Sequence, residues 1–127
     1  MSWSVNIFVG SGARLEEIAA ELESMLGNKL TPVCEDGEET QYEWSAPSYE
    51  LVLGAHDLLD DKGIPFEECP VQIALWATNV PDWEASRQEC MNIAGSIFES
   101  LKATRRYRLL LVRNVQELLQ QYSPVQL

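Results

Sequence analysis

The feature that most restricts the fold of this chain is a pair of amphipathic helical patterns, each with a single apolar stripe. Between Leu15 and Leu26 apolar residues recur at helical spacing, and four glutamates lie on the other side. A second stripe over residues 90–101 follows Asp82, a residue type that caps helix N-termini well. Because a helix with one apolar stripe must bury it against another element, both helices are predicted to pack on a sheet.

Short segments of alternating apolar and polar residues, together with short apolar runs, predict the strands of that sheet. Six such segments are found, at residues 3–9, 30–34, 40–45, 49–53, 71–78 and 106–112. The segment at 71–78 is the most apolar, so it is expected near the centre of the sheet. Asn114 to Glu117 has the spacing of a capping box, which predicts a short C-terminal helix carrying Leu118, Leu119 and Tyr122.

These patterns predict an α+β fold in one domain that covers residues 1–127. Short turns join neighbouring strands, so the sheet should be mainly antiparallel, with five to six strands. The two main helices should cover one face of it as a two-layer sandwich, followed by the short C-terminal helix. A chain of 127 residues with 46% apolar residues can build one hydrophobic core of this kind.

The net charge of −11 is unusual, and it is unevenly distributed. Residues 1–101 carry 19 acids and 4 bases, whereas residues 102–127 carry 1 acid and 5 bases. A chain this acidic is expected to bind neither nucleic acid nor anionic membranes, and to attract basic proteins. Four of the bases are Arg105, Arg106, Arg108 and Arg113. They are predicted to pair with acidic neighbours such as Glu43 or Glu50.

The cysteines and the N-terminus indicate the compartment. Cys34, Cys69 and Cys90 are odd in number and form no Cys-x-x-Cys pair, which is typical of a reducing compartment. The chain lacks a signal peptide pattern, and no run approaches the roughly 20 apolar residues of a membrane span. A cytoplasmic protein is therefore expected. All three thiols are interpreted as structural, with Cys69 the most reactive candidate.

Two features could support catalysis or ligand binding, and each has a plainer interpretation. Gly10-Ser11-Gly12 lies between a strand and a helix, as phosphate loops do, but the Walker lysine is missing, which favours a tight turn. His56 is the only histidine, and the spacing of the aspartates near it fits neither a common zinc site nor an EF-hand. No catalytic residue, metal ligand or cofactor is therefore assigned.

Two surfaces are candidates for binding a partner. The first is the loop from His56 to Glu68, with five acids against one lysine. Its carboxylates would surround Ile64 and Phe66 as apolar anchors, or these two side chains would pack inward and the acids would only solvate the loop. The second is an aromatic patch of Tyr42 and Trp44, if they face the uncovered side of the sheet. The binding residues predicted in the loop are Asp57, Asp60, Asp61, Ile64, Phe66, Glu67 and Glu68.

Three segments carry a resemblance in layout to small acidic bacterial proteins of uncharacterised function: SVNIFVGSGARLEEIAAELESMLG, LDDKGIPFEECPVQIAL and RYRLLLVRNVQELL. Some proteins of this size and acidity are immunity proteins that neutralise toxins. With the acidic surface, the resemblance favours a cytosolic, non-enzymatic protein that captures a basic protein, such as a toxin. Two alternatives stay open: a small-ligand-binding protein or enzyme using the Gly10–Gly12 turn or the His56 loop, and a structural subunit that forms a homodimer.

Overall fold

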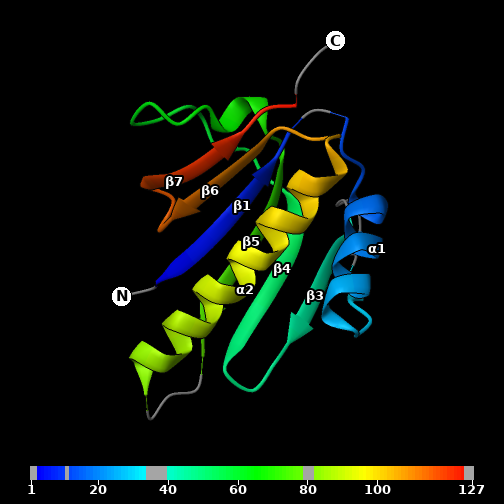
Figure 1. The fold of residues 1–127 in the computed structure, drawn as a ribbon, viewed down its shortest axis with the longest axis vertical. Coiled ribbons are helices and arrows are strands. Elements are labelled where there is room, and N and C mark those ends of the chain that lie inside the picture. Colours follow the sequence, from blue (N-terminus) through cyan, green and yellow to red (C-terminus); the bar gives the residue numbers. More distant parts are fainter. Residues whose placement is uncertain (1–2, 11, 34–39, 79–81, 125–127) are drawn as a thin grey trace.

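In the part of the chain that the structure describes, seven strands form one antiparallel sheet, and two α-helices pack on one of its faces (Figure 1). This structure, a computed structural model, describes residues 3–10, 12–33, 40–78 and 82–124, so Ser11 and Cys34 lie outside the described residues. The strands are β1 (Ser4–Val9), β2 (Thr31–Val33), β3 (Gln41–Ser45), β4 (Tyr49–Ala55), β5 (Val71–Ala77), β6 (Leu109–Arg113) and β7 (Glu117–Tyr122). The helices are α1 (Leu15–Leu26), α2 (Trp83–Thr104) and the short 3-10 helix η1 (Phe66–Glu68). The strands lie in the order β2-β3-β4-β5-β1-β6-β7.

The predicted α+β class with an antiparallel sheet is confirmed, and the sheet has one strand more than the upper limit expected. β5 lies inside the sheet between β4 and β1, as its apolar sequence predicted. Both main helices also begin close to where the sequence placed them. The Asp82 carboxylate accepts a hydrogen bond from the Ala85 N–H at 3.1 Å, which confirms it as the N-cap of α2.

Each helix ends in a left-handed residue, and both bury their apolar stripes. α1 stops at Gly27, whose N–H donates the last helical hydrogen bond to the Glu23 carbonyl at 3.0 Å and whose positive φ of 71° then turns the chain out of the helix. The stripes of α1 and α2 pack on residues of β1, β4, β5 and β6 that point to the same side, such as Ile7 and Leu75. Within the described residues, neither helix combines the length and the apolar character that crossing a bilayer requires.

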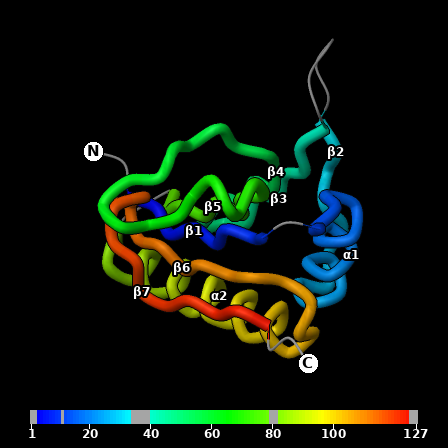
Figure 2. The backbone as a smooth tube through the Cα atoms, turned by 90° about the horizontal axis from the view of Figure 1, so that it is seen from above, coloured from blue at the N-terminus to red at the C-terminus, as the bar shows by residue number. Residues whose placement is uncertain are grey.

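A second, smaller core lies on the opposite face of the sheet. It consists of Phe8, Ile64, Phe66, Cys69, Leu110 and Val112. The connection between β4 and β5, residues 56–70, supplies three of these side chains and lies on the side of the sheet away from α2 (Figure 2). The protein therefore has a partial third layer, which the predicted two-layer sandwich did not include.

The predicted C-terminal helix is wrong, because residues Glu117–Tyr122 form strand β7 beside β6. Asn114 and Val115 adopt left-handed conformations, with φ of 54° and 56°, and turn the chain into a hairpin. The Gln116 N–H closes this turn on the Arg113 carbonyl at 3.1 Å. The Asn114 N–H and carboxamide oxygen are both occupied by the backbone of Ser4, so the residue expected to cap a helix fixes the hairpin to β1 instead.

Candidate functional site

The acidic loop, residues 56–70, is anchored to the sheet by two apolar side chains. Ile64 and Phe66 are each 2% exposed, and the Phe66 ring meets the Phe8 ring of β1 edge-on, with centroids 4.9 Å apart. They pack inward because Phe8 and the apolar residues of β6 present a surface that the helices leave uncovered. Ile64 and Phe66 therefore do not form the exposed anchor for a partner that the sequence hypothesis gave them.

Two loop carboxylates brace the backbone of the loop. The Asp60 carboxylate accepts a hydrogen bond from the Glu67 N–H at 2.9 Å, and the Glu67 carboxylate accepts one from the Asp60 N–H at 3.1 Å. The Glu68 carboxylate is held by the Arg108 guanidinium at 2.6 Å. Three of the five predicted acidic binding residues thus help to shape the loop, although all five are exposed: Asp57, Asp60, Asp61, Glu67 and Glu68.

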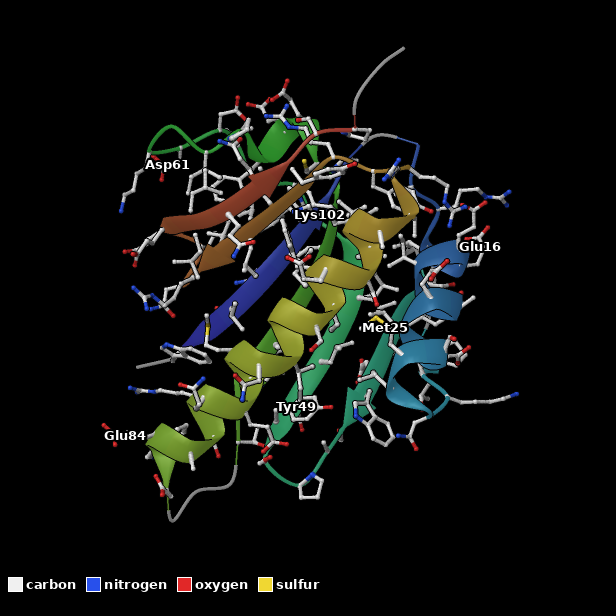
Figure 3. The ribbon with its side chains drawn as sticks, viewed as in Figure 1. Glu16, Met25, Tyr49, Asp61, Glu84 and Lys102 are labelled. Atoms are coloured by element: carbon white, nitrogen blue, oxygen red, sulfur yellow. The ribbon has the colours of Figure 1, made fainter. Side chains whose placement is uncertain are left out.

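The remaining two acids flank an apolar side chain that the sequence did not single out. Leu59 is 72% exposed, the largest exposure among the described large apolar residues of the chain. Asp57 and Asp61, both exposed, stand two residues before and two residues after it in the sequence, and Asp61 lies in the outer part of the loop at the periphery of the molecule (Figure 3). The sequence does not single out Leu59, because a lone leucine in an acidic loop can be either exposed or buried.

His56 has a structural role at the start of the loop. Its Nδ1 accepts a hydrogen bond from the Leu58 N–H at 3.0 Å, and its Nε2 contacts the Cys69 carbonyl, which makes Nε2 the protonated nitrogen. The ring also meets Phe8 edge-on at 5.0 Å. Both nitrogens are therefore engaged by backbone groups of the loop. Among the described residues, no three His, Cys, Asp or Glu side chains converge as metal ligands.

Cys69 and Cys90 are both fully buried free thiols, and burial raises the pKa of each to about 11. Cys69 lies in the second core rather than at an accessible loop edge, so it is not the reactive thiol that its place in the sequence indicated. Thiolates are the nucleophilic form, and these two cysteines hold their protons at neutral pH.

In a Cys34→Ser variant, the thiols of Cys69 and Cys90 are expected to alkylate about a hundredfold more slowly at pH 8 than in urea. Iodoacetamide labelling followed by intact mass checks this. Folding stability should also fall as the pH rises from 9.0, the ordinary thiol pKa, to about 11, because only the unfolded chain loses these protons in that window. Labelling at equal rates in both conditions would contradict the buried placement.

The aromatic residues Tyr42 and Trp44 face the helices, not the uncovered side of the sheet. They pair with Leu53 and Leu51 of β4, which belong to the main core, and paired residues share one face. The Trp44 indole N–H donates to the Tyr49 hydroxyl at 3.3 Å. Both are partly buried against the main core, so the predicted aromatic interface at this place is wrong.

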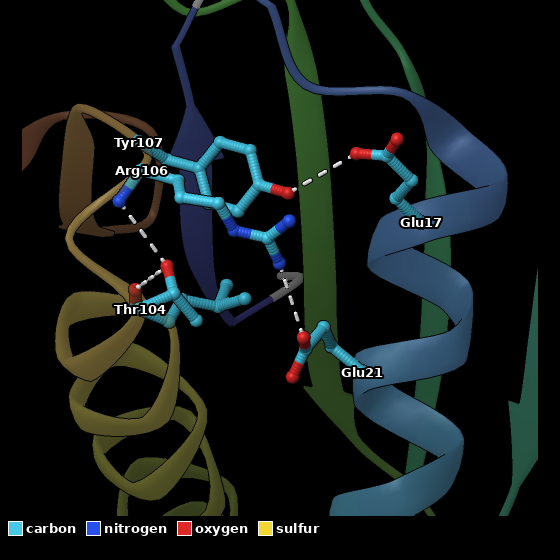
Figure 4. Close-up of polar contacts among 6 residues, drawn as sticks. Glu17, Glu21, Thr104, Arg106 and Tyr107 are labelled. Carbon is cyan, nitrogen blue, oxygen red and sulfur yellow. Dashed lines mark hydrogen bonds and ion pairs between the residues drawn. The ribbon is translucent and has the colours of Figure 1, made fainter.

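The basic segment pairs with acidic neighbours, as predicted, but with different ones. Arg106 contacts Glu21 of α1 at 3.2 Å, and the Tyr107 hydroxyl donates to Glu17 at 3.4 Å (Figure 4). Arg113 pairs with Glu117, four residues further on. Glu43 and Glu50, the expected partners, lie on β3 and β4, away from all of these contacts.

A hollow of about 730 Å³ lies beside this basic segment and does not include His56. It is lined by Glu67, Glu68, Pro70, Arg106, Arg108, Ser123 and Pro124. Its two arginines are already paired, Arg106 with Glu21 and Arg108 with Glu68. Both guanidinium groups are therefore partly neutralised within the chain, although the buried Arg108 Nε has no hydrogen-bond partner among the described residues.

Gly10, the residue after β1, approaches Arg108, the residue before β6, closely. The Gly10 N–H donates to the Arg108 carbonyl at 2.7 Å, and a Cβ on Gly10 would lie 2.8 Å from the Arg108 Cβ. Glycine is required here for packing, which agrees with the tight-turn interpretation.

Comparison with known proteins gives no further guide to this site. No family model matches the chain, and no curated protein or solved structure is significantly similar to it.

Proposed function

We propose that this chain is a non-enzymatic binding protein whose acidic loop captures a basic protein. The observation that carries the proposal is Leu59, an apolar side chain that is 72% exposed, with the exposed acids Asp57 and Asp61 two residues before and after it in the chain. The loop that presents it is held by Ile64, Phe66 and the paired backbone contacts of Asp60 and Glu67. Binding residues placed on a rigid scaffold lose little conformational entropy when a partner docks.

The acids of α1 and the acids beside Leu59 differ in whether they are engaged within the chain, and this difference supports the proposal. The four glutamates of α1 are engaged within the chain: Glu16 with Arg14, Glu17 with Tyr107, Glu21 with Arg106, and Glu23 with the Leu30 N–H. Asp57 and Asp61, by contrast, are exposed and take no part in the ion pairs found among the described residues. Their charge is available to a partner.

The most concrete version of this function is an inhibitor, such as an immunity protein that blocks a basic toxin in the cytoplasm. The loop would occlude the active cleft of the partner, with carboxylates in place of the phosphates of its substrate. The net charge of −11 would steer a basic partner towards the surface and speed association. Leu59 would supply the apolar contact that slows dissociation once the charges are aligned.

The test uses an Asp57→Lys/Asp61→Lys variant and the partner identified by affinity capture with the wild-type chain. Association of the purified partner is expected to slow at least about tenfold at low salt, and its salt dependence should weaken. Stopped-flow kinetics at several salt concentrations measure both effects. Asp60, Glu67 and Glu68 are left unchanged because they shape the loop.

The matched control is Glu84→Lys/Glu99→Lys, which makes the same change in net charge on exposed positions of α2. This control should slow association much less, because it leaves the loop intact. If both double variants slow association equally, only the overall charge matters and the loop is not the binding site. A captured partner that is itself acidic would contradict the proposed function.

A further inference from the structure

We infer that the uncovered face of the sheet carries a recognition site for an arginine side chain of a basic partner, centred on Trp76. This inference rests on the proposed function and names a second contact surface for the same kind of partner. It replaces the aromatic patch expected at Tyr42 and Trp44, which face the other way.

The strand register places Trp76 beside a carboxylate. Trp76 of β5 pairs with Glu50 of β4 on one side and with Ser4 of β1 on the other. In the next row along the sheet, Ala74 pairs with Val52, and Val52 pairs with Glu43 of β3. Paired residues point to the same side of a sheet, so an indole and two carboxylates share one face.

This face is the one that the helices do not cover. The neighbours of Trp76 along β5, Leu75 and Ala77, point into the main core beneath the helices. Trp76, Val52 and Ala74 belong to neither core cluster in the described part of the chain, and each keeps part of its surface exposed. The acidic loop covers the sheet only around Phe8, Leu110 and Val112.

The polar side chains of β1 and β5 on this face are hydrogen-bonded to one another. Asn6 is 1% exposed, and its amide donates to the Ser4 hydroxyl at 3.1 Å. The Gln72 amide in turn donates to the Asn6 oxygen at 2.9 Å. The groups left to contact a partner are the indole, Glu43 and Glu50. Among the described residues, the Glu50 carboxylate has only a 3.5 Å contact with the Ser45 hydroxyl.

An arginine side chain fits these groups best. A guanidinium stacks on the face of tryptophan, the ring that attracts cations most strongly, and can bond a neighbouring carboxylate at the same time. The described residues of β1 to β5 that point to this side include no lysine or arginine, so nothing in the described strands competes for the carboxylates. A second copy of the chain is disfavoured as the occupant, because each copy carries a net charge of −11.

The two surfaces lie at opposite ends of the same strands. β4 ends at Ala55 and β5 begins at Val71, so Glu50 and Trp76 each lie five residues along their strands from the acidic loop, about 17 Å. A partner that contacts both Leu59 and Trp76 must span this length of the sheet.

The experiment follows the tryptophan indole N–H resonances by NMR while a hexa-arginine peptide is added, with hexa-lysine as the comparison. The Trp76 resonance is assigned by its absence in Trp76→Phe. It is expected to shift and to saturate with hexa-arginine. A Glu43→Gln/Glu50→Gln variant should weaken that response about tenfold, whereas the charge-matched Glu84→Gln/Glu99→Gln should change it little.

The outcomes separate this inference from the proposed function. Shifts of the Asp57, Leu59 and Asp61 amides without a Trp76 shift overturn the inference and leave the loop as the binding surface. A Trp76 shift without any change in the loop amides supports the inference and contradicts the proposal that the acidic loop is the binding surface. Equal responses to both peptides overturn the arginine site. A concentration-dependent dimer lost in Trp76→Phe would show that the face binds a second copy, which also overturns it.

Discussion

Replacing Phe66 by alanine is expected to destabilise the protein by about 3–5 kcal/mol, the cost of removing a buried aromatic side chain. Phe66 packs against Phe8 within the second core, so its removal leaves a cavity beneath the loop. The free energy of unfolding from urea denaturation, followed by circular dichroism, measures the effect. The loop should lose its amide protection before the sheet does, because its main apolar anchor has gone.

Leu59→Ala is the matched control for this prediction. It removes an apolar side chain from the same loop, but Leu59 is 72% exposed, so stability should change by less than about 0.5 kcal/mol. Equal destabilisation by the two substitutions would show that the loop packs through Leu59 rather than through Phe66. The two variants also separate stability from binding, since Leu59→Ala should weaken partner binding in a protein that is otherwise unchanged.

Replacing Gly10 by alanine is expected to cost about 1–3 kcal/mol, although only one methyl group is added. The new Cβ would lie 2.8 Å from the Arg108 Cβ and 3.2 Å from its carbonyl oxygen, and these atoms belong to or adjoin the β6 backbone. The strands must separate to admit it, which strains the hydrogen bond between the Gly10 N–H and the Arg108 carbonyl. Thermal and urea unfolding measure the loss.

The control is the same substitution at Gly95 in α2, where an added Cβ meets no atom within 4 Å. Alanine favours helix more than glycine does, so Gly95→Ala should stabilise the protein by about 0.5–1 kcal/mol. The two alanine variants should therefore change stability in opposite directions. A Gly10→Ala variant as stable as the wild type would contradict the close approach of the turn to β6.

Part of the negative charge of this chain is engaged in contacts within the fold, and part remains exposed without an ion pair among the described residues. The glutamates of α1 fix the helix to the segment after α2 through Arg106 and Tyr107 (Figure 4). Surface ion pairs of this kind each contribute little to stability, about 0–1 kcal/mol, but they partly neutralise the acids of α1. Exposed carboxylates without an ion pair among the described residues remain on the loop, on the uncovered face and on α2.

Local sequence determined the helices and most of the strands. The stripe of α1 and the Asp82 cap of α2 are short-range signals that tertiary contacts had no reason to override. The alternation in β1 and β4 likewise fixed which residues share a face. Alternation has a period of two, however, and it does not say which of the two faces will be covered.

Only the tertiary structure shows which face of the sheet is covered, and therefore which side chains remain exposed as candidate binding surfaces. The predicted aromatic patch required Tyr42 and Trp44 to face the uncovered side of the sheet. Their pairing with β4 places them on the side that the helices cover. The same register put Trp76 on the uncovered side. Ile64 and Phe66 pack inward because they bury the apolar surface of Phe8. Phe8 lies in a strand more than fifty residues earlier in the chain, so local sequence does not show this contact.

The last strand shows most clearly why sequence alone misled. Leu118, Leu119 and Tyr122 have the spacing of a helical stripe, yet they lie in β7. The β6–β7 register shifts between Leu111 and Val112, and this irregularity lets Leu119 and Tyr122, three residues apart, both pack on the main core. A bulged strand can therefore imitate a helix in its apolar pattern, and only pairing with β6 distinguishes the two.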